Sequence, residues 1–176
     1  MSYSVLIAGE IAAKNIDSLN KFGKAADFDV ENGHVVALGD KSNEKGENDV
    51  YTVNKPTAGK LATDIFYMVN EPVNVLVNGK YSGLTDDPRE FNIPAKKVFT
   101  MYKPMVGDEV VITENGIEGT KSDNTHVVPA NNTTKLTWTD ATKIGDVSLA
   151  YKYVGDTYVS IGNERVKAYR FICVKA

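Results

Sequence analysis

The sequence has little cysteine, little histidine and no excess of positive charge. Its only cysteine, Cys173, cannot form a disulfide within the chain or build a cysteine metal cage. The net charge of −3 and the pI of about 5.4 argue against a nucleic-acid partner. No basic amphipathic segment suggests a membrane surface, and no apolar run approaches the ~20 residues that cross a bilayer. Residues 1–14 lack the basic start of a signal peptide. We therefore expect neither nucleic acid nor membrane as a partner.

The length and composition are those of an ordinary globular protein. A chain of 176 residues with 42% hydrophobic and 24% charged residues can bury a core without disulfide bonds. We predict a single β-rich domain over residues 1–176, with a small subdomain or an extended N-terminal arm at residues 1–23 as the alternative. Stability must then come from packing, from assembly or from both.

Turn signals are the strongest local feature. Asn-Gly tolerates the positive φ angles of tight hairpin turns, and it lies between apolar runs at 32–33, 78–79 and 115–116. Glycine-first turns are predicted at 155–156 and 162–163. These turns predict an all-β fold, mainly antiparallel, with roughly a dozen short strands in barrel-like or sandwich sheets. The glycine of each Asn-Gly pair is predicted to hold a positive φ.

Strand patterns are clear toward the C-terminus. Apolar and polar side chains alternate in 147–154, which is typical of a half-buried antiparallel strand. Both faces are largely apolar in 166–174, which predicts a central strand covered on both sides. Helical signals are weak, with one or two turns predicted within 14–23 and one turn within 85–91. Residues 40–48 are polar and predict an exposed, flexible loop.

Individual reactive groups each have a simpler structural explanation. The stretch DFDVENG, at 27–33, has alternate acids as a calcium loop does, but its glycine comes one place late and no bidentate glutamate closes the loop. The only histidines, His34 and His126, come from distant segments and are expected to be exposed rather than to bind a metal. Cys173 lies in an apolar strand and is expected to be a buried hydrophobic side chain.

Two clusters of side chains suggest weaker hypotheses. Asp86, Asp87 and Glu90 can be read as a carboxylate pair for glycoside cleavage, although adjacent acids on a turn point apart and normally face solvent. Five aromatic side chains suit a carbohydrate-stacking surface, or equally a core or a protein interface: Trp138, Tyr151, Tyr153, Tyr158 and Tyr169. The sequence contains no phosphate loop, nucleophile elbow or dinucleotide fingerprint. We predict no enzyme, and no catalytic, cofactor-binding or metal-binding residues.

Several longer phrases of the sequence resemble a known family. They are ENGHVVALGD (31–40), VYTVNKPTAGKLATDIFYMVNEP (50–72), KKVFTMYKPMVGDEVVIT (96–113) and YVSIGNERVKAYRFICVKA (158–176). In this order and spacing they are similar to small proteins encoded beside the major capsid protein of tailed phages, the head decoration or capsid-stabilising (cement) proteins. The resemblance covers about residues 24–175, and the first 20 residues and the 115–135 region depart from it.

The resemblance implies a virion structural protein without catalytic residues or cofactors. Its expected place is the exterior of the phage head, after synthesis in the host cytoplasm, and its expected partner is the major capsid protein. Self-association on the capsid is a further expectation. Another virion β-module, such as a head-fibre base or a tail component, is the first alternative. A carbohydrate-binding module is the second alternative.

Overall fold

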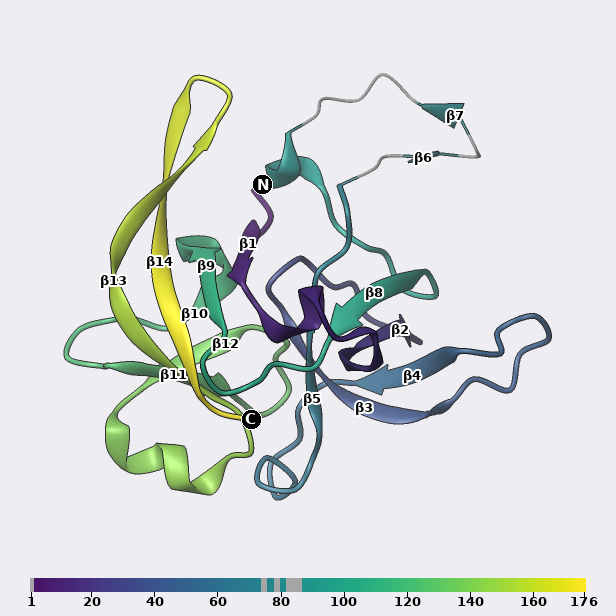
Figure 1. Cartoon of the computed structure of the whole chain (residues 1–176), viewed down its shortest axis with the longest axis horizontal. Coiled ribbons are helices and arrows are strands. Elements are labelled where there is room, and N and C mark those ends of the chain that lie inside the picture. Colours follow the sequence, from purple (N-terminus) through teal and green to yellow (C-terminus); the bar gives the residue numbers. More distant parts are fainter. Residues whose placement is uncertain (1, 74–75, 78–79, 82–86) are drawn as a thin grey trace.

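The computed structural model describes residues 2–73, 76–77, 80–81 and 87–176. Strands make up 45% of the chain and helical turns 11%, which confirms the predicted all-β fold. Within the described part, every helical element is a short 3-10 helix, and none is long and apolar enough to cross a membrane. The strands form a closed barrel, a seven-stranded sheet and a small two-stranded hairpin (Figure 1).

Five strands close into a small barrel. In neighbour order they are β2 (Asn20–Ala25), β4 (Val50–Asn54), β3 (Val35–Lys41), β5 (Phe66–Val69) and β8 (Val98–Tyr102). Only the β2–β4 pair is parallel among these contacts. Inward-facing side chains such as Val36, Val53, Phe99 and Met101 fill the barrel and are almost fully buried. Gly23 makes room for them, because a Cβ there would lie 2.9 Å from Met101 Sδ.

The second sheet has seven strands and contains the longest hairpin. In neighbour order they are β1 (Leu6–Glu10), β9 (Glu109–Thr113), β14 (Glu164–Lys175), β13 (Ala150–Ile161), β11 (His126–Pro129), β12 (Leu136–Thr139) and β10 (Ile117–Glu118). Its pairs are antiparallel apart from β10–β12. β13, β14, β9 and β1 lie side by side on the left of Figure 1.

Short elements join the strands. They are η1 (Ala12–Lys14), η2 (Asp17–Leu19), η3 (Pro88–Glu90), η4 (Glu114–Gly116), η5 (Ala141–Asp146) and the hairpin strands β6 (Leu76–Val77) and β7 (Lys80–Tyr81). Two of them, η1 and η2, lead from β1 of the seven-stranded sheet to β2 of the barrel. The helical turns predicted within 14–23 and 85–91 are confirmed as η2 and η3. Asp87 caps η3 by accepting a hydrogen bond from the Arg89 backbone N–H at 2.8 Å.

One large buried cluster joins the barrel to the seven-stranded sheet. Phe66 and Met68 of β5 pack in the same cluster as Trp138 of β12, Tyr151 of β13 and Phe171 of β14. The N-terminal stretch belongs to both parts, since residues 6–10 form β1 of the sheet and residues 20–25 form β2 of the barrel. The sheets therefore hold each other in a fixed relation, because separating them would expose this shared apolar surface to water.

The predicted turn at 162–163 is confirmed. Ile161 pairs with Glu164, which leaves Gly162 and Asn163 as a two-residue turn, and Gly162 has a φ of +57°. The turn at 32–33 is also present, because Gly33 has a φ of +86° and the His34 N–H donates to Glu31 O at 3.1 Å. It does not join two paired strands, however, because β3 pairs with β4 and β5 rather than with residues 26–30.

Two other hairpin predictions are wrong. Gly155 and Asp156 lie inside β13, where a bulge after Tyr153 absorbs one extra residue and pairing with β14 continues. Gly116 ends the short helix η4 and is not among the glycines with positive φ. Its role is close packing, because a Cβ there would lie 2.1 Å from Ser4 Oγ. Asn78 and Gly79 lie outside the described residues.

β14 is a central strand, as predicted, but its outer face is covered only in part, at the buried Ala168. Tyr169, Phe171 and Cys173 are buried in the shared core. On the other face Arg170 is exposed and Val174 is 36% exposed, so the expectation of cover on both sides is wrong. Packing against the barrel needs only one face of the sheet, which leaves the opposite face open.

The polar loop predicted at 40–48 is exposed, although β3 extends through Lys41 into its start. The loop then crosses to β4 through a turn that includes Glu44 and Glu47. Both carboxylates form ion pairs with Lys24 of β2, at 2.6 Å and 2.9 Å. The loop is therefore tied to the barrel by one side chain.

Candidate functional site

His34 is buried, so the expectation of an exposed histidine is wrong. Only 4% of it is accessible, because the turn at 31–34 is pressed against Thr134 from the loop before β12. Nδ1 accepts a hydrogen bond from the Glu31 N–H at 3.2 Å and lies 2.9 Å from Thr134 Oγ1. Burial, and then the nearby Lys135 ammonium, lower the pKa of His34 from 6.5 to about 3. The imidazole is a neutral structural group.

His126 is buried as well, contrary to expectation, and lies apart from any metal-binding cluster. It is 8% exposed, its Nδ1 lies 2.9 Å from Thr125 Oγ1, and burial lowers its pKa. Within the described ranges, no three histidine, cysteine, aspartate or glutamate side chains come together as metal ligands would. Acids of the 27–33 stretch have other partners: Asp29 accepts from the Ala95 N–H at 2.9 Å, and Glu31 accepts from the Ser4 N–H at 2.6 Å.

Cys173 is a buried hydrophobic residue, as predicted. It is 1% exposed within the shared core, and its Sγ donates to Lys175 O at 3.3 Å. Burial raises the pKa of the Cys173 thiol to about 12. The reactive thiolate is therefore scarce at neutral pH.

Asp87, one of the three acids considered for glycoside cleavage, is held in an ion pair and capping contact rather than left free for that role. The Asp87 carboxylate is used by Arg89, whose guanidinium binds it at 2.6 Å and lowers the pKa of Asp87. Glu90 lies within η3, and Asp86 lies outside the described residues. The arrangement is a capped turn that fixes the position of Arg89.

The aromatic set belongs mainly to the core, so a carbohydrate-stacking surface is not formed. Trp138 contacts Tyr153, Tyr169 and Phe171, with ring centroids 5.3–5.7 Å apart. Trp138, Tyr151 and Tyr169 are at most 8% exposed. Tyr158 alone of the five is strongly exposed, at 58%. A single exposed ring does not form an extended stacking platform. Tyr158 lies on β13, near the end of the β13–β14 hairpin.

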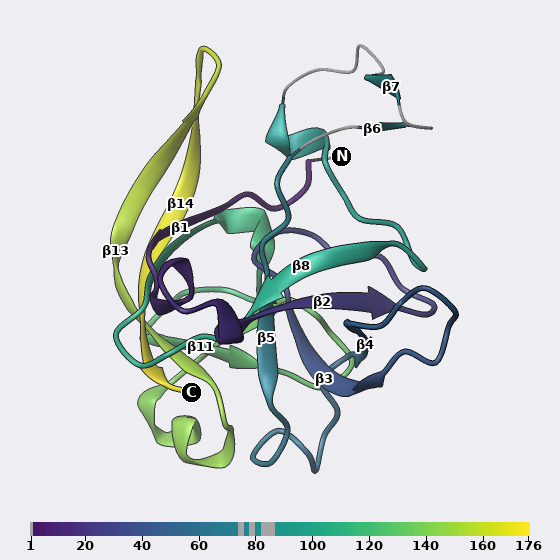
Figure 2. The same cartoon turned by 45° about the vertical axis from the view of Figure 1, so that its right-hand side comes forward.

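The β13–β14 hairpin is a prominent exposed feature of the described structure. β14 pairs with β9 only through residues 168–172, whereas β13 and β14 continue to pair up to the 162–163 turn. The end of the hairpin therefore extends past its neighbours, as Figures 1 and 2 show. Near this end Arg165 lies over the exposed Tyr158 ring, 5.3 Å from its centroid. Tyrosine and arginine are the side chains that most often dominate protein interfaces.

Ion pairs brace the hairpin from both sides. On one side Arg89 of η3 binds the Glu164 carboxylate beside the turn. On the other side Lys167 binds Glu114 of η4 at 2.6 Å. A hydrogen bond from Lys167, and then one from Tyr169, lower the pKa of Glu114. These contacts fix the direction of the hairpin, although each exposed pair adds little to overall stability.

A second pair of contacts acts nearer the base of the hairpin. Asp156, next to the bulge, accepts a hydrogen bond from the Tyr153 hydroxyl at 2.7 Å. Lys121 binds the same carboxylate at 3.0 Å and lies 4.0 Å from the centroid of the Tyr153 ring. The hydrogen bond from Tyr153, and then the one from Lys121, lower the pKa of Asp156. The 118–125 segment is thereby held against the hairpin.

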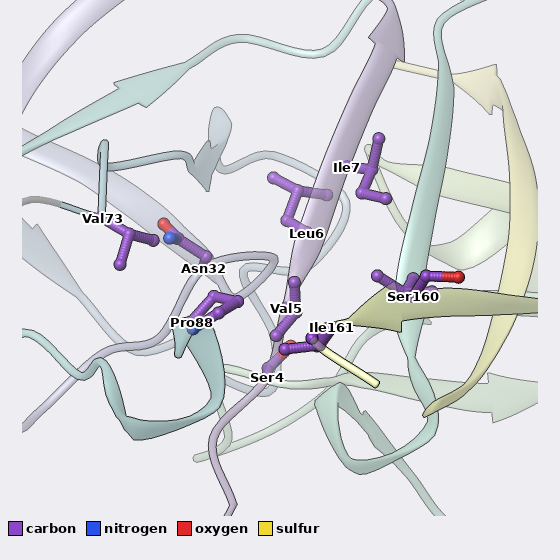
Figure 3. A pocket seen from close by; sticks show the side chains of 11 residues that line it. Ser4, Val5, Leu6, Ile7, Asn32, Val73, Pro88, Ser160 and Ile161 are labelled. Carbon is purple, nitrogen blue, oxygen red and sulfur yellow. The ribbon is translucent and has the colours of Figure 1, made fainter. Parts of the chain in front are cut away.

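A groove of about 440 Å³ lies between the hairpin and the N-terminal segment. Figure 3 shows Ser4 and Val5 along one chain segment, with Ile161 of the hairpin on one side and Pro88 of η3 on the other. None of the residues that line it is charged. The groove lacks the convergent titratable groups of a catalytic pocket, and its chemistry suits uncharged contacts.

The braced hairpin could be inferred only in part from the sequence. The 162–163 turn and the alternation in β14 were readable, whereas the Arg89–Glu164 pair joins residues 75 positions apart and has no local signal. No protein-family model, curated protein or solved structure matches the chain. The geometry of the hairpin therefore carries the functional argument.

Proposed function

We propose that the chain is a structural protein of a phage virion that binds the outside of the head and contacts the major capsid protein. The observation that carries the proposal is the braced hairpin, which presents Tyr158 and Arg165 on a rigid support. Rigid presentation favours docking, because little side-chain and loop entropy is lost on binding. The resemblance to head decoration proteins supplies the class of partner.

In this role the protein needs no cofactor and carries out no reaction. A protein that binds assembled capsid, and not free subunits, stabilises the assembled shell by mass action. Many copies clamping adjacent subunits raise the temperature that the shell survives even when each copy binds modestly. The protein is made in the host cytoplasm and acts on the capsid exterior.

Sedimentation of purified protein with heads that lack it tests the proposal. We expect saturable binding, insensitive to chelators, that raises the temperature of genome release. Replacing both Tyr158 and Arg165 by alanine is expected to weaken binding about tenfold or more, as for hot-spot residues. Phe22→Ala is the matched control, because Phe22 is an exposed aromatic residue (48%) on the barrel.

Other outcomes select another role. Binding to tails or head fibres, with none to heads, assigns the chain to another virion module. Binding to a glycan, with none to any virion part, assigns it to carbohydrate recognition. Head binding that the double variant leaves unchanged keeps the class of partner but removes the hairpin from the interface.

A further inference from the structure

The outer face of the seven-stranded sheet is open and apolar over four adjacent strands. Ile7 of β1 pairs with Val111 of β9, and Val111 pairs with Arg170 of β14. Directly paired residues share a face of a sheet, so these side chains form one row. Ile7 is 45% exposed and Val154, the extra residue of the β13 bulge, is 54% exposed. We define the outer patch as Ile7, Val111, Val154, Ile172 and Val174 with the charged residues that border it.

Opposite charges border the two sides of this patch. Glu10 of β1 and Glu109 of β9 are direct cross-strand partners, so two exposed carboxylates stand side by side at one edge. Like charges in that position destabilise a sheet. Arg170 of β14 and Lys152 of β13 are exposed on the other side. In the described structure, none of these four side chains has an ion-pair partner within 4.0 Å.

Arg170 is positioned to contact a partner. A Cβ on Gly155 would lie 3.2 Å from Arg170 Nη2, so the guanidinium lies across the glycine of the bulge. The bulge and its glycine thus make room for an arginine lying flat on the sheet. Glu10, Glu109, Ile172 and Lys152 lie in one row across the sheet, with Glu10 and Lys152 at its ends about three strand spacings, or ~14 Å, apart. Arg170 lies in the next row, on the strand beside Glu109.

We infer that the outer patch is a two-fold interface between two copies of this chain. A two-fold axis places the same patch of both copies in contact. If residue i of one copy contacts residue j of the other, then residue j of the first copy contacts residue i of the second. With the axis running between β9 and β14, the acidic half of one copy (Glu10 and Glu109) faces the basic half of the other (Arg170 and Lys152). The apolar side chains of both copies are covered, and each unpaired charge gains an opposite charge.

Charge complementarity favours a second copy of this chain over an unrelated partner. The acids lie on β1 and β9 and the bases on the adjacent β14 and β13, so a two-fold axis along the strands sets each against its opposite. The outer patch is separate from Tyr158 and Arg165 at the hairpin end, so the inference does not depend on binding to heads. The dimer would present two hairpins and increase avidity for a repeating shell.

Analytical ultracentrifugation of the full chain, from about 1 to 500 μM, tests the inference at low ionic strength. We expect a shift from one copy of 19.2 kDa toward twice that mass as concentration rises. Arg170→Glu and Glu109→Arg are each expected to weaken association tenfold or more. An equimolar mixture of the two variants is expected to dimerise as the parent does, because every contact across the two-fold axis then joins opposite charges.

The mixing experiment separates a lost interface from a lost fold, since a misfolded variant cannot be rescued by its counterpart. Arg165→Glu is the matched control and is expected to leave association unchanged, because Arg165 lies on the same strand but outside the outer patch. A parent chain that stays monomeric over the whole range overturns the inference. So does a dimer that both single variants leave intact, or a mixture that does not recover.

Discussion

Acid should destabilise this protein through His34 more than through any surface group. The folded pKa is about 3, and an unfolded histidine has a pKa near 6.5, so the unfolded chain binds the proton first. Stability therefore falls as pH drops through 6.5, and it continues to fall until pH approaches 3. Between pH 7 and pH 5 the linkage relation gives a loss of about 2 kcal/mol from this group alone. Both pH values lie well above the folded pKa, so the loss depends little on its exact value.

The surroundings of His34 explain why its imidazole stays unprotonated in the folded protein. Nδ1 is occupied as an acceptor of the Glu31 N–H, and the Lys135 charge opposes a second positive charge. The Glu31 carboxylate lies 3.7 Å from Nε2 and favours the charged form. That carboxylate already accepts the Ser4 N–H, and the cost of burying the imidazolium outweighs its attraction.

The test compares the parent with His34→Asn. The asparagine amide oxygen keeps an acceptor for the Glu31 N–H but does not titrate. Urea unfolding, followed by fluorescence of the single tryptophan Trp138, gives the free energy at pH 7, 6 and 5. We expect the parent to lose about 2 kcal/mol more than the variant over this range. Equal losses in the two proteins would show that His34 does not cause the pH dependence, whatever their difference in stability at pH 7.

Three further perturbations check the packing. Gly116→Ala should destabilise by about 1–3 kcal/mol, because its Cβ meets Ser4 Oγ and Ile112 Cγ2, whereas Gly145→Ala, with nothing within 4 Å, should change thermal unfolding little. Iodoacetamide at pH 8 should label Cys173 only after urea is added; rapid labelling of the native protein would contradict the raised pKa of its thiol. Replacing most of the 40–48 loop by a short Gly-Ser link should cost little stability, because closure entropy varies slowly with loop length and the lost ion pairs of Lys24, one exposed and one partly buried, lie at the surface. A large drop in melting temperature would show that the loop packs against something more.

Local sequence patterns did not predict which polar side chains are buried. His34 follows a turn and was predicted to be exposed, yet Thr134, 100 positions further along the chain, covers it. The sequence was compatible with the aromatic residues forming either a surface or a core. In the structure they are core residues, because Phe66 and Met68 of the barrel strand β5 pack beside them. Burial depends on which distant segment comes to lie above a residue, and no local pattern states that.

The all-β class, the weak helices, the buried Cys173 and the turn at Gly162 could all be predicted from local sequence patterns. These follow from local chemistry, because glycine tolerates a positive φ and alternating apolar residues bury one face of a strand. That Gly155 continues a strand and that Gly116 makes room for Ser4 depends on contacts with distant parts of the chain. The same holds for the outer face of β14, which stays open because the barrel covers only its inner face. The reason is physical: dihedral preferences act within a few residues, whereas pairing and burial are set by contacts between residues far apart in the chain.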